Sequence, residues 1–437
     1  MSFPVHAIVD YEDPYVQPII VDALKSQLGS SCGVHTSFST VPTESRLLQI
    51  RAYEALDFEY GMTESETLMN AYVIRKALIR KHYLSNMIQL WTAKTAKSKL
   101  RQHFMPAEDF ELDYAEFLDD ALVETFELRA SFEKNAELEP AERQWWILKP
   151  SMSDRGQGIR LFSTEEELLA IFEEWEAQNP DSDEDDENED DAGAGDEAQS
   201  TANADYIVTS HLRHFVAQPY IHPPLLISDS PFNNRKFHIR TYVVAAGALR
   251  VYVYSHMLAL FASESYSPPW TATGRDSDST EDEAILQRMR NVHLTNTCVQ
   301  RSTGKETIDE DNVFLFSKLP LSIEIQDSIK QQIEDTTAEL FRAAASYPTN
   351  FQALPNAFEV FGVDFLVDEK SNVWLLEVNA FPDFAQTGQE LKEVVVKGLW
   401  EEIANVVVAP HFGIGDLGAR DGTSKLVKVL DMDMGRR

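Results

Sequence analysis

The chain has 437 residues, of which 43% are hydrophobic and 25% charged, which is typical of a soluble globular protein with two or three domains. Its 72 acidic and 38 basic side chains give a formal net charge of −34, which disfavours direct binding to nucleic acid. The chain has only two cysteines, no run of about 18 uncharged apolar residues, and no start resembling a secretory signal. We therefore expect a cytoplasmic protein without membrane spans, a disulfide framework or a zinc site.

Charge is spread unevenly along the chain. Residues 181–197 carry 11 acidic side chains and no basic ones, and the surrounding stretch 177–204 has too little apolar content to fold, so we expect a disordered acidic insertion. Between Thr67 and Ala107 there is no acidic residue at all. The basic residues of this interval form either a solvated helix face or a surface that holds an anion: Arg75, Lys76, Arg80, Lys81, Lys94, Lys97, Lys99 and Arg101.

The N-terminal residues are typical of a small α/β unit. Residues 5–9 form a short apolar run, and apolar side chains recur with helical spacing from Tyr15 to Leu28. Residues 64–90 predict one or two long helices with a cap at Thr63.

Residues 145–150 form an apolar strand that carries Lys149 near its end. The next loop contains Gly156 and Gly158, and an amphipathic helix is predicted over residues 164–175. A glycine loop can place backbone N–H groups against phosphate oxygens, and a lysine beside it can reach the same phosphate. On this segment alone, a phosphate site and a turn with an exposed lysine remain equal alternatives.

Two further strand patterns cover residues 213–221 and 237–254. In the segment RKFHIR, Lys236, His238 and Arg240 alternate with apolar residues, so the three basic groups share one face of a strand. Like charges on one face repel each other unless an anion lies among them. A bound polyphosphate is therefore favoured over a solvent-exposed sheet face.

The C-terminal part predicts a flexible loop at 263–282, a long helix at 323–345 and a terminal helix at 388–406. Two apolar strands within 358–380 flank the turn 369–372 and predict a hairpin.

Acidic residues interrupt both strands of this hairpin. Burying a carboxylate in an apolar strand costs several kcal/mol unless it is paired or binds a metal. If the strands pair across the turn, Asp364 lies opposite Glu377, and Glu377 and Asn379 share one face. Such an all-oxygen cluster suits magnesium. The alternative is that the acids pair with basic side chains such as Lys236.

These segments together resemble the tubulin–tyrosine ligase family of ATP-grasp enzymes, and its fungal members most closely. The resemblance rests on Lys149 with its glycine loop, VAQPYI, RKFHIRTYVV, HLTNT and FEVFGVDFLVDEKSNVWLLEVNAFP, in that order along the chain. It implies an α/β (α+β) ATP-grasp fold in which two α/β subdomains sandwich ATP behind a small N-terminal α/β domain. The implied division is 1–62 for the small domain, 63–148 and 149–410 for the subdomains, and 411–437 for a tail.

The resemblance also implies roles for individual residues. Asp364, Glu377 and Asn379 match the magnesium ligands, and Lys236, Arg240 and Glu377 match catalytic positions. The residues that match nucleotide-binding positions are Lys76, Lys149, Gln218, Pro219, Tyr220, Ile221, Lys236, Arg240, Thr295 and Asn296.

The implied function is ATP- and Mg²⁺-dependent carboxylate–amine ligation, which forms an amide through an acyl phosphate on a protein or peptide acceptor such as a tubulin tail. The chain departs from the family pattern at three places. His238 replaces an acid, Pro219 replaces a lysine, and residues 254–261 contain no arginine to hold an acceptor carboxylate. Two alternatives therefore stay open: a ligase of the same fold with a non-tubulin acceptor, and a nucleotide-binding scaffold with P-body or mRNA-decay partners.

Overall fold

The computed structural model of the chain describes residues 5–42, 45–63, 66–151, 156–177, 213–272, 279–295, 312–414 and 424–435. Asn296, residues 152–155 of the glycine loop and residues 178–204 of the predicted acidic insertion lie outside the described residues.

The N-terminal part is a four-stranded parallel sheet of order β2-β1-β3-β4. Its strands are β1 (Val5–Asp10), β2 (Cys32–His35), β3 (Arg46–Arg51) and β4 (Thr67–Met69). Helix α1 (Gln17–Leu28) buries Ile19, Ile20, Ala23 and Leu24, the apolar face that its spacing predicts. The same core contains apolar side chains from the helical C-terminal segment η9 (Lys392–Lys397), α13 (Gly398–Ile403), η10 (Ala404–Val408) and α14 (Ala409–His411).

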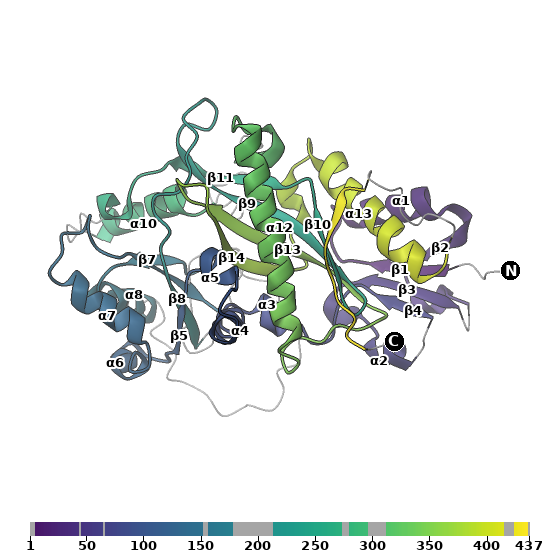
Figure 1. Cartoon of the computed structure of the whole chain (residues 1–437), viewed down its shortest axis with the longest axis horizontal. Helices are drawn as coiled ribbons and strands as arrows, with labels where there is room; N and C mark the ends of the chain where they lie inside the picture. Colours follow the sequence, from purple (N-terminus) through teal and green to yellow (C-terminus); the bar gives the residue numbers. More distant parts are fainter. Residues whose placement is uncertain are drawn as a thin grey trace.

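A seven-stranded sheet forms the centre of the molecule. Strand β9 (Arg235–Ala246) is buried along its whole length and pairs with β10 (Arg250–Tyr254), β11 (Leu258–Ser265) and β13 (Phe358–Val367). The remaining strands are β12 (Val313–Leu315), β14 (Val373–Ala380) and β15 (Leu426–Asp431). Helix α12 (Ile323–Ala345) lies across β9, β13 and β14, as Figure 1 shows, and contributes Ile333 and Leu340 to their core.

A second four-stranded sheet, antiparallel and of order β5-β8-β6-β7, lies at the other end of the molecule. It consists of β5 (Glu108–Glu111), β6 (Trp146–Pro150), β7 (Arg160–Phe162) and β8 (His214–Pro219). Helices α6 (Leu118–Ala121), α7 (Phe126–Asn135) and α8 (Glu165–Ala177) supply its core, in which Phe110, Phe172 and Trp175 surround Phe215.

Most sequence-based predictions of elements are confirmed, including the helix at 323–345 and the hairpin formed by β13 and β14. The mixed α/β class is confirmed as well. The prediction of one or two long helices over 64–90 is wrong for the first half of this range, because Thr67–Met69 pairs with β3 and helix begins only with α3 (Lys76–Ile79) and α4 (Lys81–Lys94). The predicted loop at 263–282 is also too long, since helix α10 (Ser279–His293) begins inside it.

The division at residues 62, 148 and 410 stays a prediction. Within the described ranges, no helix is both long and apolar enough to cross a membrane.

We predict that Phe215→Ala lowers the free energy of unfolding by about 3–5 kcal/mol, because it leaves a cavity among Phe110, Phe172 and Trp175. Urea unfolding followed by tryptophan fluorescence measures this loss. As a control, Phe126→Ala removes a side chain that is 74% exposed and should change stability by no more than about 0.5 kcal/mol. Equal losses in the two variants would contradict the assignment of this core.

Candidate nucleotide site

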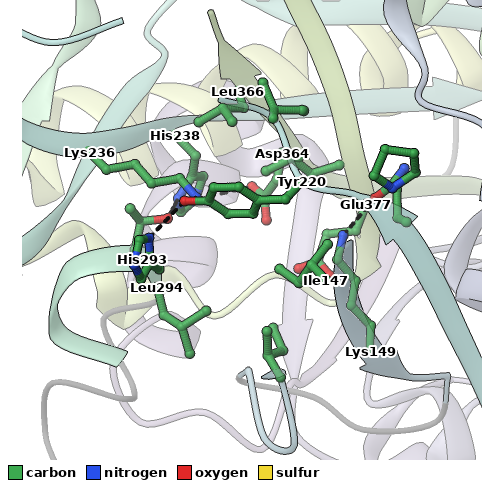
Figure 2. A pocket seen from close by; sticks show the side chains of 16 residues that line it. Ile147, Lys149, Tyr220, Lys236, His238, His293, Leu294, Asp364, Leu366 and Glu377 are labelled. Atoms are coloured by element: carbon green, nitrogen blue, oxygen red, sulfur yellow. Dashed lines mark hydrogen bonds and ion pairs between the residues drawn. The ribbon is translucent and has the colours of Figure 1, made fainter. Parts of the chain in front are cut away.

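A cleft with an empty volume of about 660 Å³ lies where the second four-stranded sheet faces the central sheet (Figure 2). Strands β6 and β8 contribute Lys149 and Gln218 to its lining, and β9, β13 and β14 contribute Lys236, Asp364 and Glu377. The sequence predicted these residues as one site, and the structure brings them together. Their roles as nucleotide and metal ligands stay predictions.

Lys149 enters the cleft from β6 and is almost completely buried. Its Nζ donates a hydrogen bond of 2.9 Å to Oε1 of Gln218, whose Nε2 donates to the carbonyl of Met105 at 3.0 Å. Burial lowers the pKa of Lys149 to about 8, although the carboxylate of Glu377 opposes this shift. The ammonium therefore loses its proton readily unless an anion binds beside it.

Lys236 lies across the cleft from Lys149 (Figure 2). Its Nζ donates to the hydroxyl of Tyr220 at 3.1 Å, and this hydroxyl lies 2.8 Å from Nδ1 of His293. Burial and the charge of Lys149 lower the pKa of Lys236 to about 7. Burial and the charge of Lys236 lower the pKa of His293 to about 3, so its imidazole is neutral, and its tautomer decides whether Nδ1 accepts from or donates to Tyr220.

Asp364 is held from two sides. Both Nε and Nη2 of Arg240 donate to its carboxylate, the latter at 2.8 Å, and His238 Nε2 lies 3.5 Å from Oδ1. The other ring nitrogen of His238 lies 2.6 Å from Oγ1 of Thr295. Burial alone would raise the pKa of Asp364, but the charges of Arg240 and His238 hold it well below its usual range. Asp364 is therefore a permanent anion.

Glu377 lies opposite Asp364 in the β13–β14 register, as the hairpin predicts. Nδ2 of Asn379 donates to Asp364 at 3.3 Å and to Glu377 at 3.2 Å, and Nζ of Lys81 lies 3.9 Å from Glu377. Lys236 was the alternative partner that the sequence offered for these acids, but its ammonium donates a hydrogen bond to Tyr220 instead. Rotating the Asn379 amide by half a turn would exchange its nitrogen for its oxygen. Asp364, Glu377 and Asn379 would then all direct oxygen atoms to one point.

This donor set fits magnesium, which is usually held by one or two carboxylates together with phosphate oxygens and water. In the described ranges, no group of three or more His, Cys, Asp or Glu side chains is placed to hold a metal. If the two carboxylates and one amide held a metal, oxygens from water or a bound phosphate would have to complete its coordination shell.

Other predicted site residues are placed as follows. Pro219, Tyr220, Ile221 and Thr295 line the cleft, whereas Arg240 and Asn379 reach it through Asp364. Lys76 does not line the cleft, and its exposed ammonium lies 5.1 Å from the ring centre of Tyr83.

The sequence analysis missed a contact between α4 and the start of the glycine loop. The backbone N–H of His82 donates to Oγ of Ser151 at 3.1 Å, and Nδ1 of His82 contacts the same hydroxyl. The imidazole stacks on His214 with ring centres 4.7 Å apart. Burial and then the neighbouring His214 lower the pKa of His82 to about 4. No local signal indicates this contact, because the two residues lie 69 positions apart.

The family model "Tubulin-tyrosine ligase family" matches residues 63–413 of the chain. This chain belongs to the tubulin–tyrosine ligase family. A probable tubulin–tyrosine ligase of Schizosaccharomyces pombe is 40% identical over 97% of this chain and 96% of its own length. The probable ligase PBY1 of Saccharomyces cerevisiae is 41% identical over 89% of this chain, but the match spans only 49% of that relative.

A solved structure is similar to this chain over nearly its whole length. The C-terminal domain of K. lactis Pby1 is an ATP-grasp enzyme that interacts with the mRNA decapping enzyme Dcp2. It matches 98% of this chain and 99% of its own, with 34% identity and a TM-score of 0.69. The ATP-grasp fold implied by the sequence motifs is therefore confirmed.

We predict that ATP affinity falls as the pH rises from 6 to 9, because Lys236 and Lys149, with pKa values of about 7 and about 8, lose the charges that attract phosphate. Calorimetry in buffers of different ionisation enthalpy should detect uptake of about one proton per ATP at pH 8. Lys236→Arg should flatten the profile, and Lys370→Arg on the exposed turn should leave it unchanged. An unchanged profile in Lys236→Arg would argue against this lysine as a phosphate contact.

We predict that His82→Ala weakens ATP binding by about fivefold, the equivalent of one lost hydrogen bond that holds the glycine loop. Titration with ATP and Mg²⁺ measures the change, and His82→Asn should restore part of it by supplying a shorter polar side chain. His411→Ala also removes a histidine hydrogen bond, to the Thr67 carbonyl, and serves as the matched control. Equal affinities in the two alanine variants would refute the role of His82.

Proposed function

We propose that this chain is an ATP- and magnesium-dependent carboxylate–amine ligase. Membership of the tubulin–tyrosine ligase family and the ATP-grasp fold support a ligase-like enzyme. The observation that carries the specific proposal is the cleft itself, in which buried Lys149 from the second four-stranded sheet and buried Lys236 from the central sheet lie around the same space as Asp364 and Glu377. Cations for phosphate oxygens and a cluster of oxygen donors are the two components that phosphoryl transfer requires.

In the proposed reaction, a carboxylate oxygen of the acceptor attacks the γ-phosphorus of ATP, and the bond to the bridging oxygen breaks to release ADP. The resulting acyl phosphate is attacked by an amine nitrogen at its carbonyl carbon. Inorganic phosphate leaves, the nitrogen loses a proton, and an amide remains. No step requires a covalent bond to the protein, so the chain's own task is to bind, orient and stabilise charge.

Most of the predicted site residues have a place in this scheme. Backbone groups of residues 218–221 bind along the adenine, and Lys149 and Lys236 bind phosphate oxygens with their ammonium groups. Magnesium, when bound, would neutralise charge on the transferred phosphoryl group, and Asp364, Glu377 and Asn379 would hold it. Nε and Nη2 of Arg240 both donate to Asp364, which favours a role for this arginine in positioning the Asp364 carboxylate.

The acceptor is a protein or peptide, and two observations favour one other than an acidic tubulin tail. Residues 254–261 contain no arginine, and the segment Leu258–Phe261 is buried in β11. The net charge of −34 also repels a strongly acidic peptide. By similarity to K. lactis Pby1, which interacts with Dcp2, we further propose a cytoplasmic partner from the mRNA-decay machinery.

A scaffold that binds nucleotide without turnover is the second candidate, and it is favoured only by the substitutions His238 and Pro219 at family positions. Release of ADP and phosphate in the presence of candidate acceptors distinguishes it from a ligase.

We predict that ATP with Mg²⁺ raises the thermal midpoint of the wild-type chain and that Glu377→Gln loses most of the magnesium-dependent part. The reason is that the amide cannot supply the charge of a carboxylate to a hard cation. Thermal shift assays with ATP alone, with Mg²⁺ alone and with both separate the contributions. Glu369→Gln changes an exposed acid in the hairpin turn and should behave like wild type. If wild type gains no stability from ATP and Mg²⁺, the proposed nucleotide site does not exist.

A further inference from the structure

A surface remote from the cleft has a composition that the ligase chemistry does not explain. It follows the chain from Glu111 to Glu127, through the end of β5, helix α6 and the start of α7. Every exposed residue in this interval is either acidic or large and apolar. We call it the acidic–aromatic surface. Its exposed residues are Glu111, Tyr114, Glu116, Phe117, Asp119, Asp120, Val123, Glu124, Phe126 and Glu127.

The exposed apolar side chains are concentrated here. Nine large apolar side chains are exposed in the described ranges, and four of these lie between residues 114 and 126. Tyr114 is 40% exposed, Phe117 49%, Val123 53% and Phe126 74%. The rings of Tyr114 and Phe117 also contact each other, with centres 6.2 Å apart. A face that serves only for solvation has no need of three exposed aromatic rings, so the arrangement indicates an interaction surface.

The surface is firmly attached to the fold. Buried Leu112, Leu118, Leu122 and Leu128 alternate with the exposed residues and pack into the core around Phe172 and Trp175. The backbone N–H of Ala115 donates to Glu176 on α8, and that of Glu127 donates to Glu108 at 3.3 Å. Because the backbone is held in this way, the exposed rings are presented at low entropic cost to a partner.

The negative charge of the acidic–aromatic surface limits the class of partner that can bind to it. Residues 105–128 contain no lysine or arginine, exposed Arg129 follows at the edge of the surface, and the nearby Arg213 pairs with Asp113 at 3.2 Å. Acidic side chains on this scale repel nucleic acid and anionic lipid headgroups. A second copy of the chain is disfavoured too, since each copy carries −34. A basic protein segment with apolar anchors satisfies both the charges and the rings.

We propose that the acidic–aromatic surface docks a lysine- and arginine-rich protein segment whose apolar side chains pack against Tyr114, Phe117 and Phe126. Figure 1 places α6 and α7 at the end of the molecule away from the N-terminal sheet, and none of these residues lines the nucleotide cleft. The partner therefore binds without competing with ATP, and the inference stands whether or not the chain is a ligase.

The test uses the full chain and a synthetic amphipathic peptide with lysine and arginine on one face and leucine and phenylalanine on the other. Fluorescence anisotropy at physiological salt should show binding, and Phe117→Ser/Phe126→Ser should weaken it by at least about tenfold. Ile323→Ser, at a residue 73% exposed on α12, is the matched control and should bind like wild type. The thermal shift with ATP and Mg²⁺ should be the same in all three proteins, which verifies folding.

Three results would overturn the proposal. Equal binding to wild type and to the double variant would mean that the peptide binds elsewhere, for instance to residues 181–197. Equal binding of a peptide whose apolar positions are changed to glutamine would exclude the apolar anchors. A dimer in analytical ultracentrifugation that the double variant abolishes would assign the surface to a second copy of the chain.

Discussion

The two hydrogen bonds from Arg240 to Asp364 are the interaction on which the site depends. Both residues are buried, at paired positions of β9 and β13. Removing two such charges from water costs several kcal/mol each, and their mutual attraction offsets this cost only if their geometry is close to ideal. Two guanidinium nitrogens on one carboxylate meet that condition. Gly362 leaves room for this approach, since a Cβ there would lie 3.3 Å from Arg240 and 3.0 Å from Pro382.

The remaining polar groups of the site follow from this pair. The pairing of β13 with β14 places Glu377 opposite Asp364, and Asn379 holds the two carboxylates in one cluster by donating to both. Lys149 on β6 and Lys236 on β9 have lowered pKa values because burial removes water and supplies no complete counter-charge. The cleft thus combines an anionic cluster with two ammonium groups that lack a full counter-charge. A polyphosphate with a bound metal complements both, because the metal matches the acids and the phosphate oxygens match the lysines.

The sequence could predict those parts of the site in which partners lie on one strand or on two strands joined by a short turn. Alternation places Lys236, His238 and Arg240 together, and the hairpin register places Asp364 opposite Glu377. It could not predict the contact of His82 with Ser151, because neither residue lies in a periodic pattern that identifies the other. Strand β4 was mistaken for helix for the same physical reason, since three residues become a strand only through pairing with β3.

The contrast between the cleft and the outer surface explains how one chain can hold nucleotide and yet disfavour acidic macromolecules. Charges separated by more than about 8 Å are largely screened at physiological ionic strength. A nucleotide inside the cleft therefore responds mainly to Lys149, Lys236 and the carboxylates at contact distance. An extended peptide is longer than this screening distance and meets the acidic exterior along much of its length. Under the proposed function, acceptor choice and partner choice would both follow this distribution of charge, which favours neutral or basic polypeptides outside the cleft and a polyphosphate within it.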